Sequence, residues 1–274
     1  MSFRLNLPEL EDQPWLPAPV RTGMLDALTW ALELAGVYRA IVPRLADALR
    51  RTGATEIVDL GSGGGGGIRA VQQGVSAALG APVGVTLTDL YPNLPAFKRL
   101  AAASGGGLRY CAAPVDATAV APDLPGFRTI FSAFHHFPEP VARRVLGSAV
   151  AAGVGIGIFE GAGKHWWEWP ALWVGAPVLL LFATPFLRPF RWSRLALTYL
   201  VPLIPAGVLW DGTASLCRLY PLAALRRLAA TADPAGRYEW QCGVQPAGIG
   251  RSVTYLIGVP RPEPRPQPSF DLCI

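Results

Sequence analysis

The sequence predicts an α/β fold, a doubly wound, mostly parallel sheet of seven strands with an antiparallel C-terminal strand, plus a hydrophobic helical-hairpin insertion. Three observations lead to this prediction. A strand-like run at 56–60 breaks into a glycine-rich turn, and a helical pattern follows at once. Polar residues then stand where the later strand-like runs end. Finally, two long uncharged segments between 169 and 210 interrupt the alternation of strands and helices.

The chain is organised around the stretch EIVDLGSGGGGG, residues 56–67. The β-branched Ile57 and Val58 lead to Asp59, and six of the seven residues 61–67 are glycine. Apolar residues then recur at helical spacing from Ile68 onward. A strand, a glycine turn and a helix in this order bring backbone N–H groups and a helix N-terminus up to a ligand.

A glycine turn of this kind fits two classes of ligand. A match to the dinucleotide pattern G-x-G-x-x-G is weak here, because so many glycines match it in some register. Asp59 followed by alternating Gly61, Gly63 and Gly65 separates the two classes better. A carboxylate at the strand end repels a pyrophosphate but suits a ligand with an amine or a sulfonium. The non-functional alternative is a glycine-rich linker, but linkers are not framed by a strand and an amphipathic helix.

Composition limits the class of protein. The 274 residues are 51% hydrophobic and 16% charged with mean hydropathy +0.31, which suits one α/β domain near a membrane surface or a greasy substrate. The net charge of +5 comes from scattered arginines without a basic run, so no nucleic-acid partner is expected. Four separated cysteines and an N-terminus without an apolar core favour a cytoplasmic protein with reduced thiols.

We divide the chain into five parts: an N-terminal arm and helical lid (1–52), a ligand-binding core (53–161), a hydrophobic, Trp-rich, membrane-interacting insertion (162–211), the C-terminal part of the core (212–260) and a disordered, proline-rich tail (261–274). In the first part, residues 1–22 are expected to be irregular, and Pro43 is expected to separate two helices. In the fourth, one helix over 212–230 is expected to precede an antiparallel hairpin at the edge of the sheet.

Acidic and polar residues follow successive strand-like runs. Asp89, Asp116, Ser132 and Glu160 each stand at or just past the end of such a run. In an open parallel sheet this edge is the ligand crevice. Asp89 is placed to accept both hydroxyls of a ribose, although a cap of the following helix or turn is the alternative. For Asp116 the alternative is a turn aspartate.

His135 and His136 occupy the loop after the fourth strand. A histidine with its ordinary pKa near 6.5 is a good general base for a hydroxyl, thiol or carbon acceptor. The alternative is that these residues cap a helix or shape a pocket. Glu160 and Asp211 are secondary candidates for orienting an acceptor. Two adjacent histidines without a nearby cysteine or carboxylate make a poor metal site, so no metal is expected.

Several stretches together resemble a known superfamily. These are EDQPW, VDLGSGGGGG, TDLYPNLPAF, FSAFHHF, IFEG and LWDGTASLCRLY, and they are similar to an uncharacterised bacterial branch of the class I S-adenosylmethionine (SAM)-dependent methyltransferases. The resemblance covers 56–160 and 212–259 and implies a Rossmann-like sheet with SAM as cofactor. The SAM-binding residues expected on this basis are Asp59, Gly61, Ser62, Gly63, Gly65, Asp89, Leu90, Asp116, Ala117 and Ser132. On the chemical grounds given above, the candidate catalytic residues are His135, His136 and Glu160.

The insertion departs from the common pattern of that superfamily. Its uncharged runs at 169–187 and 195–210 are at or just below the about 20 residues needed to span a bilayer, and prolines interrupt both. Tryptophans cluster at their ends, as interfacial aromatic residues do. A spanning hairpin would put three arginines, between 188 and 194, on the far side, against the positive-inside rule. We therefore expect 166–210 to form a re-entrant or interfacial hairpin that touches lipid and roofs the acceptor pocket. The alternative is a buried lid in a soluble protein.

These observations predict a SAM-dependent methyltransferase that acts on a small, lipophilic acceptor. It is expected to be cytoplasmic and peripherally or monotopically associated with the inner face of the cell membrane. One alternative is a catalytically silent SAM-binding regulatory or assembly protein at the membrane. A less favoured alternative is an NAD(P)-dependent oxidoreductase. The sequence identifies neither the acceptor nor the oligomeric state.

Overall fold

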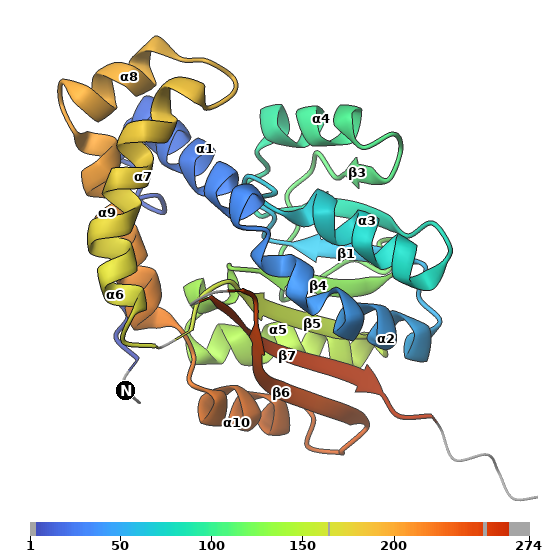
Figure 1. Cartoon of the computed structure of the whole chain (residues 1–274). Helices are drawn as coiled ribbons and strands as arrows, with labels where there is room; N and C mark the ends of the chain where they lie inside the picture. Colours follow the sequence, from blue (N-terminus) through green and yellow to red (C-terminus); the bar gives the residue numbers. More distant parts are fainter. Residues whose placement is uncertain (1–3, 164, 249–250, 263–274) are drawn as a thin grey trace, which may run out of the picture.

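The computed structural model describes residues 4–163, 165–248 and 251–262, and its centre is a seven-stranded sheet (Figure 1). The strand order is β3-β2-β1-β4-β5-β7-β6, and β7 runs antiparallel to both of its neighbours. The other pairings, among β1 to β5, are parallel. The predicted mostly parallel sheet with an antiparallel last strand is confirmed. The strands are β1 (Glu56–Leu60), β2 (Gly84–Thr88), β3 (Leu108–Tyr110), β4 (Phe127–Phe131), β5 (Ile156–Glu160), β6 (Tyr238–Pro246) and β7 (Ser252–Pro260).

Helices cover both faces of the sheet, because alternate residues of each strand point to opposite sides. Ile57 contributes to one buried core and Val58 to the other. The first core lies under η1 (Val37–Ile41), α2 (Val42–Thr52), α3 (Ile68–Leu79) and α4 (Leu94–Ala103). The second lies under α5 (Glu139–Ala152) and α10 (Leu222–Ala232). This doubly wound arrangement leaves the carboxyl ends of β1, β2, β4 and β5 at one edge.

The insertion forms a separate group of helices beside α1 (Ala18–Ala35), at the left of Figure 1. One continuous helical stretch runs from 168 to 186 and includes a π-helical turn in its first half. A third, smaller core joins the insertion to α1 through residues such as Met24, Leu180 and Ile204. The helices of the insertion are α6 (Glu168–Pro170), η3 (Ala171–Gly175), α7 (Ala176–Ala183), η4 (Thr184–Phe186), α8 (Trp192–Tyr199) and α9 (Leu203–Arg218), of which α9 continues into the C-terminal part of the core.

Three expectations about helix boundaries are wrong. Residues 18–22 belong to α1 and not to an irregular arm. Gly36, in the left-handed conformation at φ 55°, ends α1, while Pro43 lies in the first turn of α2, where a missing N–H costs little. Residues 212–230 do not form one helix, since α9 ends at Arg218 and α10 starts after Pro221. The expected disordered tail lies outside the described residues from 263 onward.

The arm, residues 4–17, contains neither helix nor strand and rests on α9. The backbone N–H of Leu5 donates to the carbonyl of Cys217 at 3.0 Å. The carboxylate of Asp211 accepts the backbone N–H groups of Leu10 at 2.6 Å and Glu11 at 3.0 Å. Asp211 was expected to orient an acceptor. In the structure it holds the arm against α9 instead.

Candidate functional site

The glycine turn joins β1 to α3 through a chain of left-handed residues. Gly61, Gly63, Gly65 and Gly67 all have positive φ, between 51° and 82°. Side chains other than glycine rarely adopt this conformation, so the alternation of glycines is a backbone requirement. A Cβ atom at Gly65 would also lie 2.3 Å from Leu100 Cδ1 on α4. The turn is thus shaped by backbone geometry and by close packing on its neighbours.

A cavity of about 280 Å³ opens beside this turn at the carboxyl edge of the sheet. Its walls come from the turn, from the ends of β2 and β4, from the loop after β3 and from α1 and η1. All ten residues expected to bind the cofactor line it: Asp59, Gly61, Ser62, Gly63, Gly65, Asp89, Leu90, Asp116, Ala117 and Ser132. The fold therefore brings together positions that lie as far apart as 59 and 132 in the sequence.

Asp59 is almost completely buried at the floor of the cavity, with 2% of its surface exposed. Its carboxyl group accepts hydrogen bonds from Ser62 Oγ at 2.6 Å and Thr129 Oγ1 at 2.8 Å. Burial raises the pKa of Asp59 to about 7, although these two hydrogen bonds oppose the rise. Much of its hydrogen-bonding capacity therefore serves to hold the turn against β4.

The two other acidic residues make local hydrogen bonds. Asp89 accepts the N–H of Gly63 at 2.9 Å and that of Tyr91 at 2.8 Å, so it links the glycine turn to the loop after β2. Asp116 accepts from both the backbone N–H and the hydroxyl of Thr118, each at 2.8 Å. Both residues therefore stabilise turns, as the alternative interpretations predicted. Both carboxylates also border the cavity.

Ser132, at the exit of β4, has a positive φ of 45° without being glycine. Its hydroxyl shares a hydrogen bond of 2.5 Å with Tyr38 and accepts the N–H of Gly161 at 3.0 Å. Tyr38 comes from η1 and is buried, and burial raises the pKa of its hydroxyl. The sequence reasoning missed Tyr38, because nothing in the pattern around residue 38 indicates a contact with the end of β4. A strained residue held by two partners at a cavity wall is typical of a functional site.

The two histidines lie side by side in η2 (Phe134–His136) but have different surroundings. His136 lines the cavity, whereas His135 has 4% of its surface exposed and does not line it. Nδ1 of His135 lies 2.8 Å from Glu160 Oε2, and its backbone N–H donates to Glu160 Oε1 at 2.9 Å. Of the three expected catalytic residues, only His136 reaches the cavity wall in the described part of the chain.

His135 and Glu160 form a buried, strongly coupled pair. Burial alone would lower the pKa of His135, but the negative charge of Glu160 and the hydrogen bond between them outweigh it and raise the pKa to about 10. Burial alone would raise the pKa of Glu160, and the same partner holds it below its ordinary value. This pair therefore fixes the orientation of the His135 ring.

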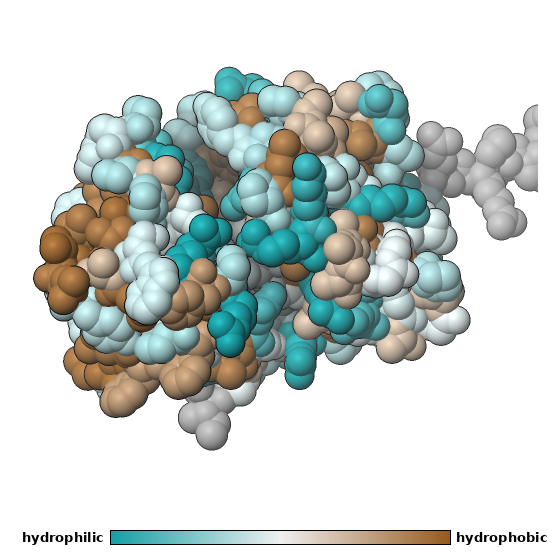
Figure 2. Space-filling view, turned by 90° about the horizontal axis from the view of Figure 1, so that it is seen from above, coloured by the Kyte–Doolittle hydropathy of each residue, from teal (hydrophilic) through white to brown (hydrophobic). Residues whose placement is uncertain are grey.

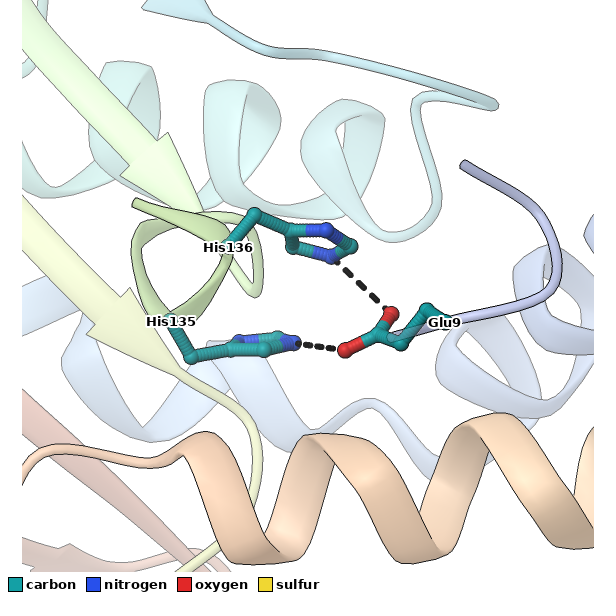
Figure 3. A group of neighbouring side chains, drawn as sticks. All are labelled: Glu9, His135 and His136. Carbon is teal, nitrogen blue, oxygen red and sulfur yellow. Dashed lines mark ion pairs between the residues drawn. The ribbon is translucent and has the colours of Figure 1, made fainter. Parts of the chain in front are cut away.

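The expectation that the histidines lack a nearby carboxylate is wrong. Glu9, from the arm, faces both rings, with 3.5 Å from Oε1 to His135 Nε2 and 3.3 Å from Oε2 to His136 Nε2 (Figure 3). Asp12 Oδ2 lies 3.1 Å from His136 Nδ1. The sequence offered a weak signal for Asp12 alone, since EDQPW (11–15) is one of the stretches that carry the resemblance, and it offered none for Glu9.

A second cavity, of about 230 Å³, lies between α1, α7 and α9. Most of its lining is apolar, and the polar residues in its wall are Glu9, Glu11, Asp211 and Ser215. Glu11 and Leu28 line both this apolar cavity and the cavity beside the glycine turn. Burial raises the pKa of Glu11 to about 7. The two cavities therefore adjoin, with a carboxyl group in their shared wall.

Comparison with known proteins identifies the fold. No family model and no curated protein match the chain. Two solved structures of the O-methyltransferase NcsB1 from neocarzinostatin biosynthesis are similar, each at 17% identity with a TM-score of 0.51. One is in complex with S-adenosyl-L-homocysteine and 1,4-dihydroxy-2-naphthoic acid, the other with SAM and 2-hydroxy-5-methyl naphthoic acid. The similarity covers 89% of this chain and 59% of those chains, so this chain matches little more than half of NcsB1. The chain shares the fold of SAM-dependent O-methyltransferases.

Proposed function

We propose that this protein is a SAM-dependent methyltransferase that acts on a small, lipophilic acceptor at the inner face of the cell membrane. The observation that carries the proposal is the pair of adjoining cavities. One is bordered by the glycine turn and three acidic residues, and the other is largely apolar and roofed by the insertion. Glu11 and Leu28 belong to both walls, so a cofactor in the first cavity and an acceptor in the second would meet there.

The cofactor side rests on the chemistry of its lining. Asp89 lines the cavity just after the end of β2, a position where acidic residues of doubly wound folds accept ribose hydroxyls, and this supports a ribose-binding role. Asp59 offers a buried carboxyl group that suits a sulfonium or amine better than a phosphate. Asp116 would accept from the adenine amine. The NcsB1 structures, which share the fold, hold SAM or its demethylated product.

The acceptor side rests on the apolar cavity. Its wall includes Met24, Leu172 and Leu180, which suit a hydrocarbon or aromatic body. The naphthoic acids in the NcsB1 complexes are flat, hydroxylated and lipophilic, which makes such compounds the first acceptors to test. Methyl transfer needs the nucleophile aligned with the sulfonium and shielded from water. Glu11 and His136 are the polar groups that such a nucleophile would meet.

The surface of the insertion supports contact with a membrane. Figure 2 shows hydrophobic residues gathered at the left, on the side that the insertion occupies in Figure 1. Among the described residues, one helix, Glu168–Phe186, is long and apolar enough to cross a bilayer, and only 17% of its apolar window is buried. The helices α8 and α9 would pass the same test together but are bent by 76°. The large apolar side chains exposed here include Trp166, Trp173, Val174, Phe182, Phe186, Trp192, Leu200 and Val201.

The arginines between 188 and 194 do not all face outward. Arg194 has 1% of its surface exposed and donates to Asp26 on α1 at 2.7 Å. It also donates to the carbonyls of Leu187 and Pro189, at 2.6 Å and 2.8 Å. Arg191 also donates to Asp26, at 3.3 Å. These two arginines therefore tie the insertion to α1, and Arg188 is the exposed one that would meet lipid phosphates.

Transfer of labelled methyl groups tests the proposal. The protein would be incubated with methyl-labelled SAM and hydroxylated naphthoic acids or cell lipid extract, with and without anionic liposomes. Label is expected in an organic-soluble product with wild-type protein, and much less of it with Asp89→Ala at SAM concentrations below saturation. Calorimetry with SAM, S-adenosylhomocysteine and NAD(P)H separates the alternatives. Binding of the first two without turnover of any extract supports a silent SAM-binding protein, and binding of NAD(P)H alone supports an oxidoreductase.

A further inference from the structure

Glu9, His135 and His136 converge on one point between the two cavities. Figure 3 shows both imidazole rings, from η2, directed toward the carboxylate that the arm supplies. One ligand atom from each residue lies within 4.8 Å of the other two. Glu9 lines the apolar cavity and His136 the cavity beside the glycine turn. Glu9 and His135 are buried, with 2% and 4% of their surfaces exposed.

The outer nitrogen of each ring already has a carboxylate partner. Glu160 Oε2 lies 2.8 Å from Nδ1 of His135, and Asp12 Oδ2 lies 3.1 Å from Nδ1 of His136. A carboxylate accepts, so each Nδ1 carries the proton and each Nε2 presents either a lone pair or a second proton to Glu9. A lone pair facing a carboxylate is repulsive, so a cation is required at this point. In the metal-free protein that cation is a proton on a ring, and a metal ion bound at this point would take its place.

The distances favour the metal ion. The two separations between Nε2 and Glu9, 3.5 Å and 3.3 Å, exceed the about 2.7–3.2 Å of a usual N–H···O hydrogen bond. Two ligands about 2.0–2.2 Å from one tetrahedral ion stand about 3.3–3.6 Å apart. Moreover, Nε2 of His135 is buried and makes no hydrogen bond within the described residues. The Nδ1 carboxylates complete the carboxylate–histidine pattern that orients metal-binding imidazoles.

The charge balance points the same way. Arg218 is the one arginine or lysine of the described chain that forms an ion pair with both Glu9 and Asp12. Its Nη1 lies 3.3 Å from Glu9 Oε1 and 3.6 Å from Asp12 Oδ2. Arg4 adds a second guanidinium, on the carbonyl of His135, and the two leave the acidic side chains of Glu9, Asp12, Glu160 and Asp211 in excess. Two imidazolium rings would balance them, but the ring centroids are 4.5 Å apart, where like charges repel. A single divalent ion neutralises the cluster without that repulsion.

The backbone that carries the rings is held in place. Arg4 Nη2 donates to the carbonyl of His135 at 3.0 Å, and Arg218 Nη2 donates to that of His136 at 2.7 Å. Tyr220 donates to the carbonyl of Phe137 at 2.6 Å. Fixed backbone and fixed ring orientation are what a preorganised ligand set needs.

We propose that Glu9, His135 and His136 bind one divalent transition-metal ion, with Glu160 and Asp12 orienting the two imidazoles. Two nitrogens and one carboxylate suit zinc, ferrous iron or cobalt and leave further coordination positions open. The role of the ion in catalysis rests on the proposed function: the ion would bind an oxygen of the acceptor and make that oxygen easier to deprotonate. The metal site itself stands without that role.

Cobalt binding tests the site. The full-length protein, freed of metal with a chelator, is titrated with Co²⁺ at neutral pH and then with Zn²⁺ as competitor. We expect one equivalent of Co²⁺ with visible ligand-field bands, displaced by Zn²⁺. Glu9→Gln and His136→Gln should bind at least about 100-fold more weakly, and Asp12→Asn about 10-fold more weakly. His165→Gln, which changes the third histidine of the chain, should bind as wild type does. Thermal unfolding checks that each variant is folded.

The proposal is overturned if the wild type shows no ligand-field bands, if the folded Glu9 and His136 variants bind Co²⁺ as tightly as the wild type, or if His165→Gln loses as much affinity as they do. Thiolate-to-cobalt charge-transfer bands would place the ion on cysteines and overturn it as well. SAM binding is measured separately on the metal-free protein. Retained SAM binding without a cobalt site contradicts this inference alone, whereas a cobalt site without SAM binding contradicts the proposed function alone.

Discussion

The carboxylate of Asp89 accepts the backbone N–H of Gly63 at 2.9 Å, which ties the end of β2 to the middle of the glycine turn. The same carboxylate borders the cavity in which SAM is proposed to bind. One side chain thus shapes the turn and remains available at its edge to a ligand with two neighbouring hydroxyls.

Replacement of this carboxylate should therefore weaken SAM binding. In Asp89→Ala, loss of hydrogen bonds to a charged acceptor, each worth about 1.5–3 kcal/mol, should lower the affinity about 10- to 100-fold by calorimetry. Asp123→Ala is the matched control, since Asp123 is exposed and outside the cavity. An Asp89 variant that binds SAM as tightly as the control would contradict the assignment.

Asp59 should make the stability of the protein depend on pH. Its pKa is raised by burial to about 7, and Asp89 adds to the rise. Between about pH 4 and pH 7 the folded protein then holds a proton that the unfolded chain has released, so stability falls as pH rises, by up to about 1.4 kcal/mol per pH unit.

Asp59→Asn removes this contribution. Because other buried acids also titrate, the quantity to measure is the difference in free energy of unfolding between variant and wild type, by denaturant titration. The variant should gain stability relative to the wild type as pH rises from about 4 to about 7, and the difference should level off above that. A difference that does not change with pH would show that Asp59 stays ionised in the folded protein.

Asp211 should control the docking of the arm. Asp211→Ala leaves the N–H groups of Leu10 and Glu11 without their acceptor, which we expect to cost about 1–2 kcal/mol of unfolding free energy because water can reach both residues. Limited proteolysis should then cut residues 4–17 faster than in the wild type. Asp47→Ala, at an exposed position of α2, serves as control. Equal cleavage rates in the two variants would count against this anchoring role.

The exposed aromatic residues of the insertion should drive membrane binding. Phe182, Phe186 and Trp192 are each at least 74% exposed, so their joint replacement by serine should change stability little. Burying one large apolar side chain is worth about 1.5–3 kcal/mol, so liposome affinity should fall by at least about 100-fold in flotation assays. Replacing Trp15 and Tyr91, which are exposed outside the insertion, is the control. A wild-type protein that does not float with liposomes rules out the membrane reading.

The glycine turn could be predicted because its signal is local. Ile57, Asp59 and the glycines after it are adjacent, and their order specifies strand, turn and helix. The acidic residues at the carboxyl edge followed from the same logic, since parallel strands end together. The end of α1 at Gly36 was harder to predict. Pro43, seven residues later, looked like the stronger signal of a helix break, but a proline also fits the first turn of a helix.

Glu9 shows why the rest of the site could not be predicted. Its partners are His135, His136 and Arg218, and the contact between Arg218 and Glu9 spans 209 residues. No periodicity or motif spacing reports a contact across that distance. Tyr38 and Ser132 are a similar case, 94 residues apart. Both contacts arise from how separate elements dock, and docking depends on the shapes of packed surfaces.

The anchoring of the arm on α9 also has a consequence for the order of events during synthesis. Residues 4–17 leave the ribosome well before Asp211 and Arg218, which hold Leu10 and Glu9 and are made roughly two hundred residues later. The sheet up to β5 can begin to assemble on the nascent chain before Asp211 and Arg218 have been made. Contacts of such long sequence separation form late. The cluster of Glu9, His135 and His136 is therefore completed only after the insertion has been translated, so a chain that stalls within the insertion carries a glycine turn but no completed site.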